Sequence, residues 1–146
     1  MGLTIRKQAE IMRRSWPDFR VLEQNRWFIC WEGVLRPLSQ KYRVQIALSR
    51  KRKNRDSRAK LSTLPSVRVI DPLLHRRVEN PSDPIPHHYP NRDCPEQPFL
   101  CLYDPAKNEW HSRLTVARII VPWTIDWLAC YEGWLATGEW TGGGRH

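Results

Sequence analysis

The stretch KYRVQIAL, residues 41–48, decides the expected fold, because apolar and polar side chains alternate along it without a break. Successive side chains of a β-strand point to opposite faces of the sheet. The apolar positions therefore fall together on one face: Tyr42, Val44, Ile46 and Leu48. This pattern predicts a strand with one face in a core and the other in solvent.

The sequence on either side of this stretch predicts three more strands. Runs rich in aromatic and β-branched residues lie at 19–24, 26–35 and 66–71. Asn25 separates the first two runs and is a residue type that favours turns. Because short connections join such runs, we expect a four-stranded antiparallel meander.

Helical spacing appears at both ends of the chain. Apolar residues recur at this spacing in residues 4–15, and Pro17 predicts that this helix ends near Ser15. A second helix is expected to begin within 114–120. Pro122 is expected to break or restart it, because proline cannot donate to the helical hydrogen bonds.

An apolar stripe follows Pro122 and predicts a long helix packed on the sheet, ending near Gly138. Its members are Trp123, Trp127, Cys130, Tyr131 and Trp134. The order of helix, four strands, long loop and helix predicts an α+β fold. A length of 146 residues fits one domain, 1–146, and we expect a flexible tail at 141–146.

Two segments have no periodic pattern. Residues 72–98 contain seven prolines and predict a long irregular loop. Residues 50–60 contain seven lysines or arginines, in a chain whose formal net charge is +9. We expect a solvated basic loop there, with docking on an acidic partner or binding of nucleic acid as alternatives. The run has no aromatic residue on which single-stranded bases could stack.

The composition favours a protein of the cytoplasm. The N-terminal residues lack the apolar core of a secretory signal, and no apolar run approaches the roughly 20 residues of a membrane span. We therefore expect no membrane partner. The four cysteines are expected to be free thiols, because disulfides are rare in that compartment.

The four cysteines fall into two pairs by context. Cys30 lies in an expected strand and Cys130 on the expected apolar helix stripe, so both are interpreted as small buried hydrophobes. Cys94 has polar neighbours. Cys101, within PFLCLY, is held by apolar neighbours at the edge of packed structure, as a rigid but reachable nucleophile would be.

Two other interpretations of Cys101 stay open at this point. His87, His88 and Cys94 could join it as zinc ligands, although the paired spacing typical of zinc sites is missing. Alternatively, His87, His88 or His111 could serve as the base of a cysteine hydrolase.

The order of several motifs resembles that of the ubiquitin-conjugating enzyme family. The matching pieces, spread over residues 4–135, are WEGVL and KYRVQIAL in the second and third strands, YPN at 89–91, FLCLY around Cys101, Trp110, and LTVARII at 114–120. Tyr89 stands where the family has its signature histidine. The aromatic-rich last helix and short ending are similar to the short bacterial branch found in type II CBASS antiphage operons.

This resemblance implies a ubiquitin-conjugating fold, an enzyme without cofactor or metal, and acyl transfer through a thioester. It implies that Cys101 carries the C-terminus of a cargo protein, a cGAS-like nucleotidyltransferase, and passes it to an amine. Asn91 matches the family's asparagine and is the candidate donor to the oxyanion. The alternative for Asn91 is a loop-holding role. Asp104 could orient an incoming lysine, although a turn role is favoured.

Two functions of other classes compete with this one. A non-catalytic member of the same fold would only dock on a partner protein. A basic nucleic-acid-binding protein would use the charge at 50–60. The presence of Cys101 favours catalysis.

Overall fold

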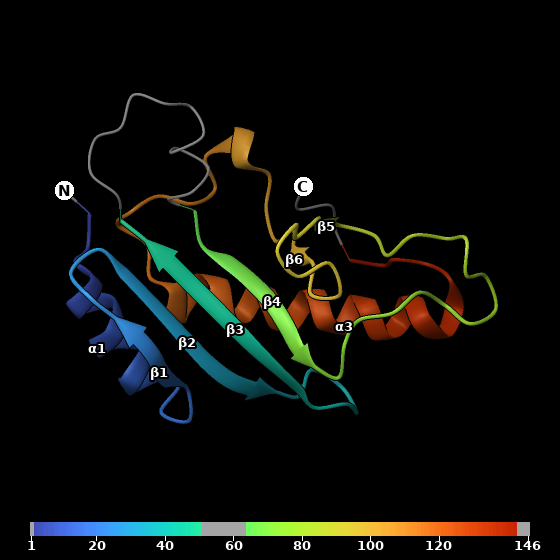
Figure 1. Cartoon of the computed structure of the whole chain (residues 1–146), viewed down its shortest axis with the longest axis horizontal. Coiled ribbons are helices and arrows are strands. Elements are labelled where there is room, and N and C mark those ends of the chain that lie inside the picture. Colours follow the sequence, from blue (N-terminus) through green and yellow to red (C-terminus); the bar gives the residue numbers. More distant parts are fainter. Residues whose placement is uncertain (1, 51–63, 143–146) are drawn as a thin grey trace.

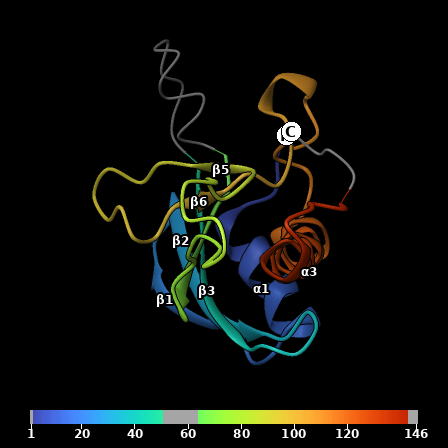
Figure 2. The same ribbon diagram turned by 90° about the vertical axis from the view of Figure 1, so that its right-hand side faces the viewer.

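The computed structural model describes residues 2–50 and 64–142. These residues form an antiparallel sheet with helices on one of its faces (Figure 1, Figure 2). The predicted α+β class is confirmed. Most of the basic segment 50–60 and the last four residues lie outside the described residues, so the predictions made for them are not addressed.

The four predicted strands are present as β1 (Arg20–Gln24), β2 (Phe28–Leu35), β3 (Tyr42–Ser49) and β4 (Ser66–Asp71). They pair in sequence order and antiparallel, as a meander does. On β3 every apolar residue of the alternating pattern is buried, which confirms its half-buried character.

The predicted strand number is wrong, because the sheet has six strands in the order β1-β2-β3-β4-β6-β5. The two additional strands, β5 (His88–Tyr89) and β6 (Phe99–Leu100), lie at the end of the segment interpreted as irregular. Each is two residues long, so neither has room for an alternating pattern. The pairing of β6 with β4, and of β5 with β6, brings this segment onto the sheet.

Helix α1 (Ile5–Ser15) agrees with the predicted helix at 4–15. The Thr4 hydroxyl caps it by accepting a hydrogen bond from the Lys7 N–H at 3.0 Å. The amide of Gln8 is buried and bonds the Leu114 carbonyl and the Val116 N–H. Those two bonds join α1 to the start of the C-terminal helical region.

The C-terminal region begins with a π-helical turn, Val116–Ile120, and continues as α3 (Val121–Thr137). The predicted restart at Pro122 is confirmed, because Pro122 lies in the first turn of α3, where a missing N–H costs least, and the chain stays helical across it. Gly138 ends α3 with a φ of 82°, as predicted. In the described part of the chain no helix is both long and apolar enough to cross a membrane.

Two predictions about packing near α3 need correction. Cys130 and Cys30 are only partly buried. Trp140, the residue just before the expected tail, packs its ring against Trp127 and His87, each with centroids 5.1 Å apart. Gly142 lies so close to Cys130 that a Cβ there would overlap the sulfur. The described part of the expected tail is thus folded onto α3.

Candidate functional site

The β5–β6 hairpin positions Cys101. Its register pairs His88 with Leu100, and the next rung is a hydrogen bond from the Cys101 N–H to the His87 carbonyl at 2.9 Å. The Trp127 indole N–H donates to the same carbonyl, also at 2.9 Å. The backbone around the cysteine is therefore fixed both to the sheet and to α3.

The Cys101 thiol is covered in this structure. The residue is 7% exposed, whereas the sequence predicted a reachable sulfur. The thiol donates to the Tyr89 hydroxyl oxygen at 3.3 Å and makes a longer contact of 3.7 Å with the Tyr103 carbonyl. Tyr89 itself is 42% exposed, so a partly solvent-exposed side chain contacts the buried sulfur through its hydroxyl. The expectation of an open nucleophile is wrong for this conformation, because the hairpin places an aromatic side chain against it.

Both tyrosines beside the thiol keep their protons at neutral pH. Burial raises the pKa of Tyr89, and its hydrogen bond to Cys101 raises it further. Burial is also the main cause that raises the pKa of Tyr103. A protonated Tyr89 hydroxyl can rotate to donate a hydrogen bond once the sulfur has lost its proton.

Asn91 makes its side-chain hydrogen bonds within its own loop. Its residue is buried, and its amide nitrogen donates to the Gln97 carbonyl at 2.9 Å while its amide oxygen accepts from the Cys94 N–H at 3.3 Å. In this structure Asn91 holds the 91–97 loop and is not brought against the thiol.

Asp104 and two of the candidate histidines make local contacts. The Asp104 carboxylate accepts from the Ala106 N–H at 2.9 Å and caps a 3-10 turn, Pro105–Lys107, which confirms the favoured turn role. The His88 ring contacts the Ile85 carbonyl, and the His111 ring accepts from the Arg113 N–H. Neither histidine hydrogen-bonds the Cys101 thiol.

The residues of the zinc interpretation are not gathered into a site. Across residues 2–50 and 64–142, no three His, Cys, Asp or Glu side chains are close enough to share a metal ion. Cys94 instead donates to the Glu96 carboxylate at 3.3 Å.

The sequence did not predict that Tyr89 and Tyr103 contact the Cys101 sulfur. In the sequence, Tyr89 is notable only because it stands where the ubiquitin-conjugating family has its signature histidine. Tyr103 lies two residues after Cys101, and residues two apart in an extended chain lie on the same side of it. This spacing is the sequence feature that could have indicated a contact between Tyr103 and Cys101.

The family comparison covers the hairpin and both helices. The family model described as "Type II CBASS E2 protein" matches residues 8–146. A search of curated proteins found no match to the chain. Because the family match extends over nearly the whole length and includes Cys101 and its anchoring elements, the chain belongs to the family of type II CBASS E2 proteins.

Proposed function

We propose that this protein is a conjugating enzyme that carries the C-terminus of a cargo protein as a thioester on Cys101 and transfers it to an amine. In the proposal the chain is a single ubiquitin-conjugating domain that acts in the cytoplasm during antiphage defence, and the cargo is a cGAS-like nucleotidyltransferase. The observation that carries it is a cysteine fixed by the β5–β6 hairpin and α3 in a chain of the type II CBASS E2 family.

The proposed chemistry has two balanced steps. The Cys101 sulfur attacks the activated carbonyl of the cargo, a carbon–sulfur bond forms, and the leaving group departs with the thiol proton. An amine of the target then attacks the thioester carbonyl, an amide bond forms, and the thiol of Cys101 is regenerated with a proton from the amine. Tyr89 must move during the first step, because its hydroxyl occupies the approach to the sulfur.

The hydrogen-bonding partners of the Cys101 thiol support the proposed thiol chemistry. Both hydrogen-bonding partners of the thiol are neutral, the Tyr89 hydroxyl and the Tyr103 carbonyl. A neutral hydroxyl next to a sulfur can stabilise a developing negative charge, whereas a carboxylate would oppose it.

Loss of conjugation on Cys101→Ala tests the proposal. We expect co-expression with the neighbouring operon genes to give higher-mass conjugates of the cargo, and Cys101→Ala to abolish them. Cys94→Ala is the matched control, since Cys94 lies in the same segment and its thiol hydrogen-bonds Glu96 rather than Tyr89. Conjugates that persist at wild-type level in Cys101→Ala would contradict the proposal.

Two alternative roles of Asn91, support of the oxyanion and stabilisation of the 91–97 loop, can be distinguished by experiment. We propose Asn91 as the amide that supports the oxyanion during transfer, although its present bonds hold the 91–97 loop. In the first case Asn91→Ala slows transfer to the amine by about a hundredfold and leaves thioester formation intact. In the second case it slows both steps together and lowers the melting temperature. Single-turnover assays of each step, with a thermal melt of the same variant, distinguish them.

A second candidate function is a binding module that docks on a partner without catalysis. The burial of Cys101 under Tyr89 favours this alternative over an enzyme with an open thiol. A partner retained equally by wild type and Cys101→Ala, without any covalent adduct, would identify it.

A further inference from the structure

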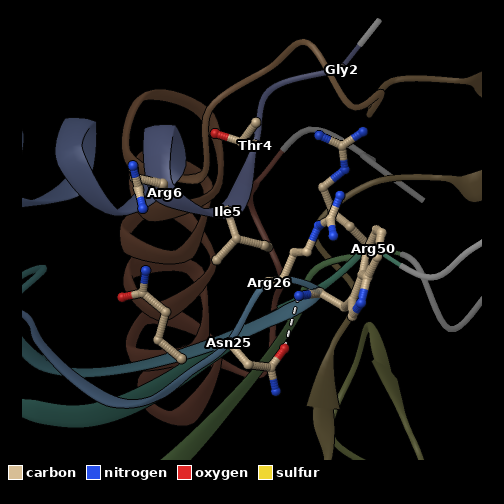
Figure 3. Close-up of a pocket in the computed structure, with 9 residues that line it drawn as sticks. Gly2, Thr4, Ile5, Arg6, Asn25, Arg26 and Arg50 are labelled. Atoms are coloured by element: carbon tan, nitrogen blue, oxygen red, sulfur yellow. Dashed lines mark hydrogen bonds between the residues drawn. The ribbon is translucent and has the colours of Figure 1, made fainter.

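A cavity of about 1230 Å³ opens at the edge of the sheet, away from the β5–β6 hairpin. Three segments build it: the residues around the start of α1, the turn between β1 and β2, and the end of β3 (Figure 3). Its lining residues are Gly2, Thr4, Ile5, Arg6, Gln24, Asn25, Arg26, Trp27 and Arg50. None of them belongs to the segment that holds Cys101, so this is a separate site.

The cavity is strongly positive. Arg6, Arg26 and Arg50 all line it, and none of the nine lining residues is acidic. Figure 3 draws Arg26 and Arg50 on one side of the cavity and Arg6 across it. Three guanidinium groups around one space repel each other, and an anion between them would relieve that repulsion.

Two arginines elsewhere in the described part of the chain form ion pairs with carboxylates. Arg14 pairs with Glu10 at 2.7 Å, and Arg20 pairs with Glu32 at 3.0 Å. Among the described residues, no carboxylate lies within ion-pair distance of Arg6, Arg26 or Arg50.

The turn beneath the arginines is held in place before any ligand binds. The Arg50 N–H donates to the Trp27 carbonyl at 2.6 Å, which extends the β2–β3 pairing by one rung. The Trp27 N–H donates to the Asn25 side-chain oxygen at 2.8 Å. The Arg26 guanidinium lies over the Trp27 ring at 4.9 Å. A site fixed in this way needs little reorganisation on binding.

We propose that this cavity binds a polyphosphate group, either as inorganic polyphosphate or as part of a nucleotide. Guanidinium forks match phosphate oxygens two at a time, and a polyphosphate concentrates several charges on neighbouring atoms, as three convergent arginines require. Trp27 is one of the lining residues, and the Arg26 guanidinium lies over its ring. The volume exceeds what a single phosphate fills and suits a nucleotide.

The test compares two variants of equal charge. One replaces the cavity arginines with glutamine: Arg6, Arg26 and Arg50. The other replaces three exposed arginines outside the cavity lining: Arg36, Arg43 and Arg118. Each change removes three positive charges and takes the formal net charge from +9 to +6 (9 − 3 = 6). Binding is measured by isothermal titration of the full chain with ATP. The titration is done at about 0.15 M salt, because salt at this concentration screens long-range attraction between exposed charges.

We expect saturable ATP binding by wild type, a loss of at least about tenfold in the cavity variant, and a change within about twofold in the control variant. Arg6→Gln alone, at an exposed site on α1, should weaken binding without affecting folding, as a circular dichroism melt would verify. No saturable binding by wild type, or equal weakening in both triple variants, would overturn the proposal.

Competition identifies the source of the phosphates. If tripolyphosphate displaces ATP at equal concentration, the site recognises the phosphate chain alone. If only nucleoside triphosphates displace ATP, the site also recognises the nucleoside. Both results support the proposal. Displacement by a single-stranded DNA oligonucleotide at a lower phosphate concentration than tripolyphosphate would overturn it in favour of nucleic acid. Stronger displacement by a poly-glutamate peptide would overturn it in favour of an acidic protein.

Discussion

The contact between the Cys101 thiol and the Tyr89 hydroxyl joins two residues on adjacent strands of a short hairpin. It gives the tyrosine two separable effects on the sulfur. The ring limits access, because Cys101 is almost fully buried beneath an exposed tyrosine. The hydroxyl, which burial keeps protonated by raising its pKa, is a donor for the thiolate that forms during acyl transfer.

Substitutions at Tyr89 separate these effects. Tyr89→Ala removes the cover, so alkylation of Cys101 by iodoacetamide should speed up by about tenfold, as exposure of a thiol does. Cys94 in the same molecule is the internal control, and its rate should not change. Tyr89→Phe keeps the cover but removes the donor, so thioester formation should slow by about tenfold. Unchanged alkylation in Tyr89→Ala would show that the ring does not protect the sulfur.

A row of polar side chains crosses the first four strands. Arg20 on β1 bonds Glu32 on β2 at 3.0 Å, Gln45 on β3 bonds the same carboxylate at 3.0 Å, and Arg68 on β4 bonds Gln45 at 2.8 Å. The hydrogen bonds from Gln45 and Arg20 lower the pKa of Glu32. Cross-strand pairs of this kind stabilise a sheet and fix its register.

The lowered pKa of Glu32 predicts an acid-dependent loss of stability. The carboxylate contributes stability at pH values above its unfolded pKa of about 4.3, and that contribution disappears as pH falls through the lower folded pKa. Glu32→Gln should therefore reduce the free energy of unfolding by about 0.5–1 kcal/mol at pH 7 and by almost nothing near pH 2. Urea unfolding at both pH values measures this. Glu23→Gln, on the exposed edge strand β1, is the control. A pH-independent difference would contradict the argument.

The longer elements were predictable from sequence, and the short ones were not. The alternation of β3 and the helical spacing of α1 each repeat several times, so both appear in the structure with nearly the predicted bounds. The strand β6 forms by pairing with β4, and β5 forms by pairing with β6; no local sequence pattern encodes either pairing. The sequence was enough to identify Cys101 as a candidate residue. Its contact with Tyr89 and the loop hydrogen bonds of Asn91 depend on the folded hairpin, so the sequence did not predict them.

Contacts between distant segments hold the whole molecule together. Gln8, near the start of the chain, is buried and bonds backbone groups of Leu114 and Val116 more than a hundred residues away. Trp127 on α3 bonds the backbone beside Cys101. The two helices and the hairpin therefore form one connected unit, and weakening the α1 contact should weaken the support of the site.

Replacement of Gln8 tests this connection. Gln8→Leu keeps the size of the side chain but leaves the Leu114 carbonyl and the Val116 N–H unpaired in a buried place. We expect the free energy of unfolding to fall by about 2 kcal/mol, the cost of leaving buried polar groups without partners. Gln24→Leu on exposed β1 is the matched control and should change stability little. Equal losses in the two variants would contradict a specific role of Gln8.

The central claim is that Cys101 carries a protein as a thioester, and intact-mass spectrometry tests it most directly. The protein is co-expressed with the neighbouring operon genes, purified without reducing agent, and weighed before and after hydroxylamine, which cleaves thioesters. The account predicts an adduct on wild type that hydroxylamine removes and that Cys101→Ala lacks. An adduct of the same mass on Cys101→Ala, or one that resists hydroxylamine on wild type, would contradict the account.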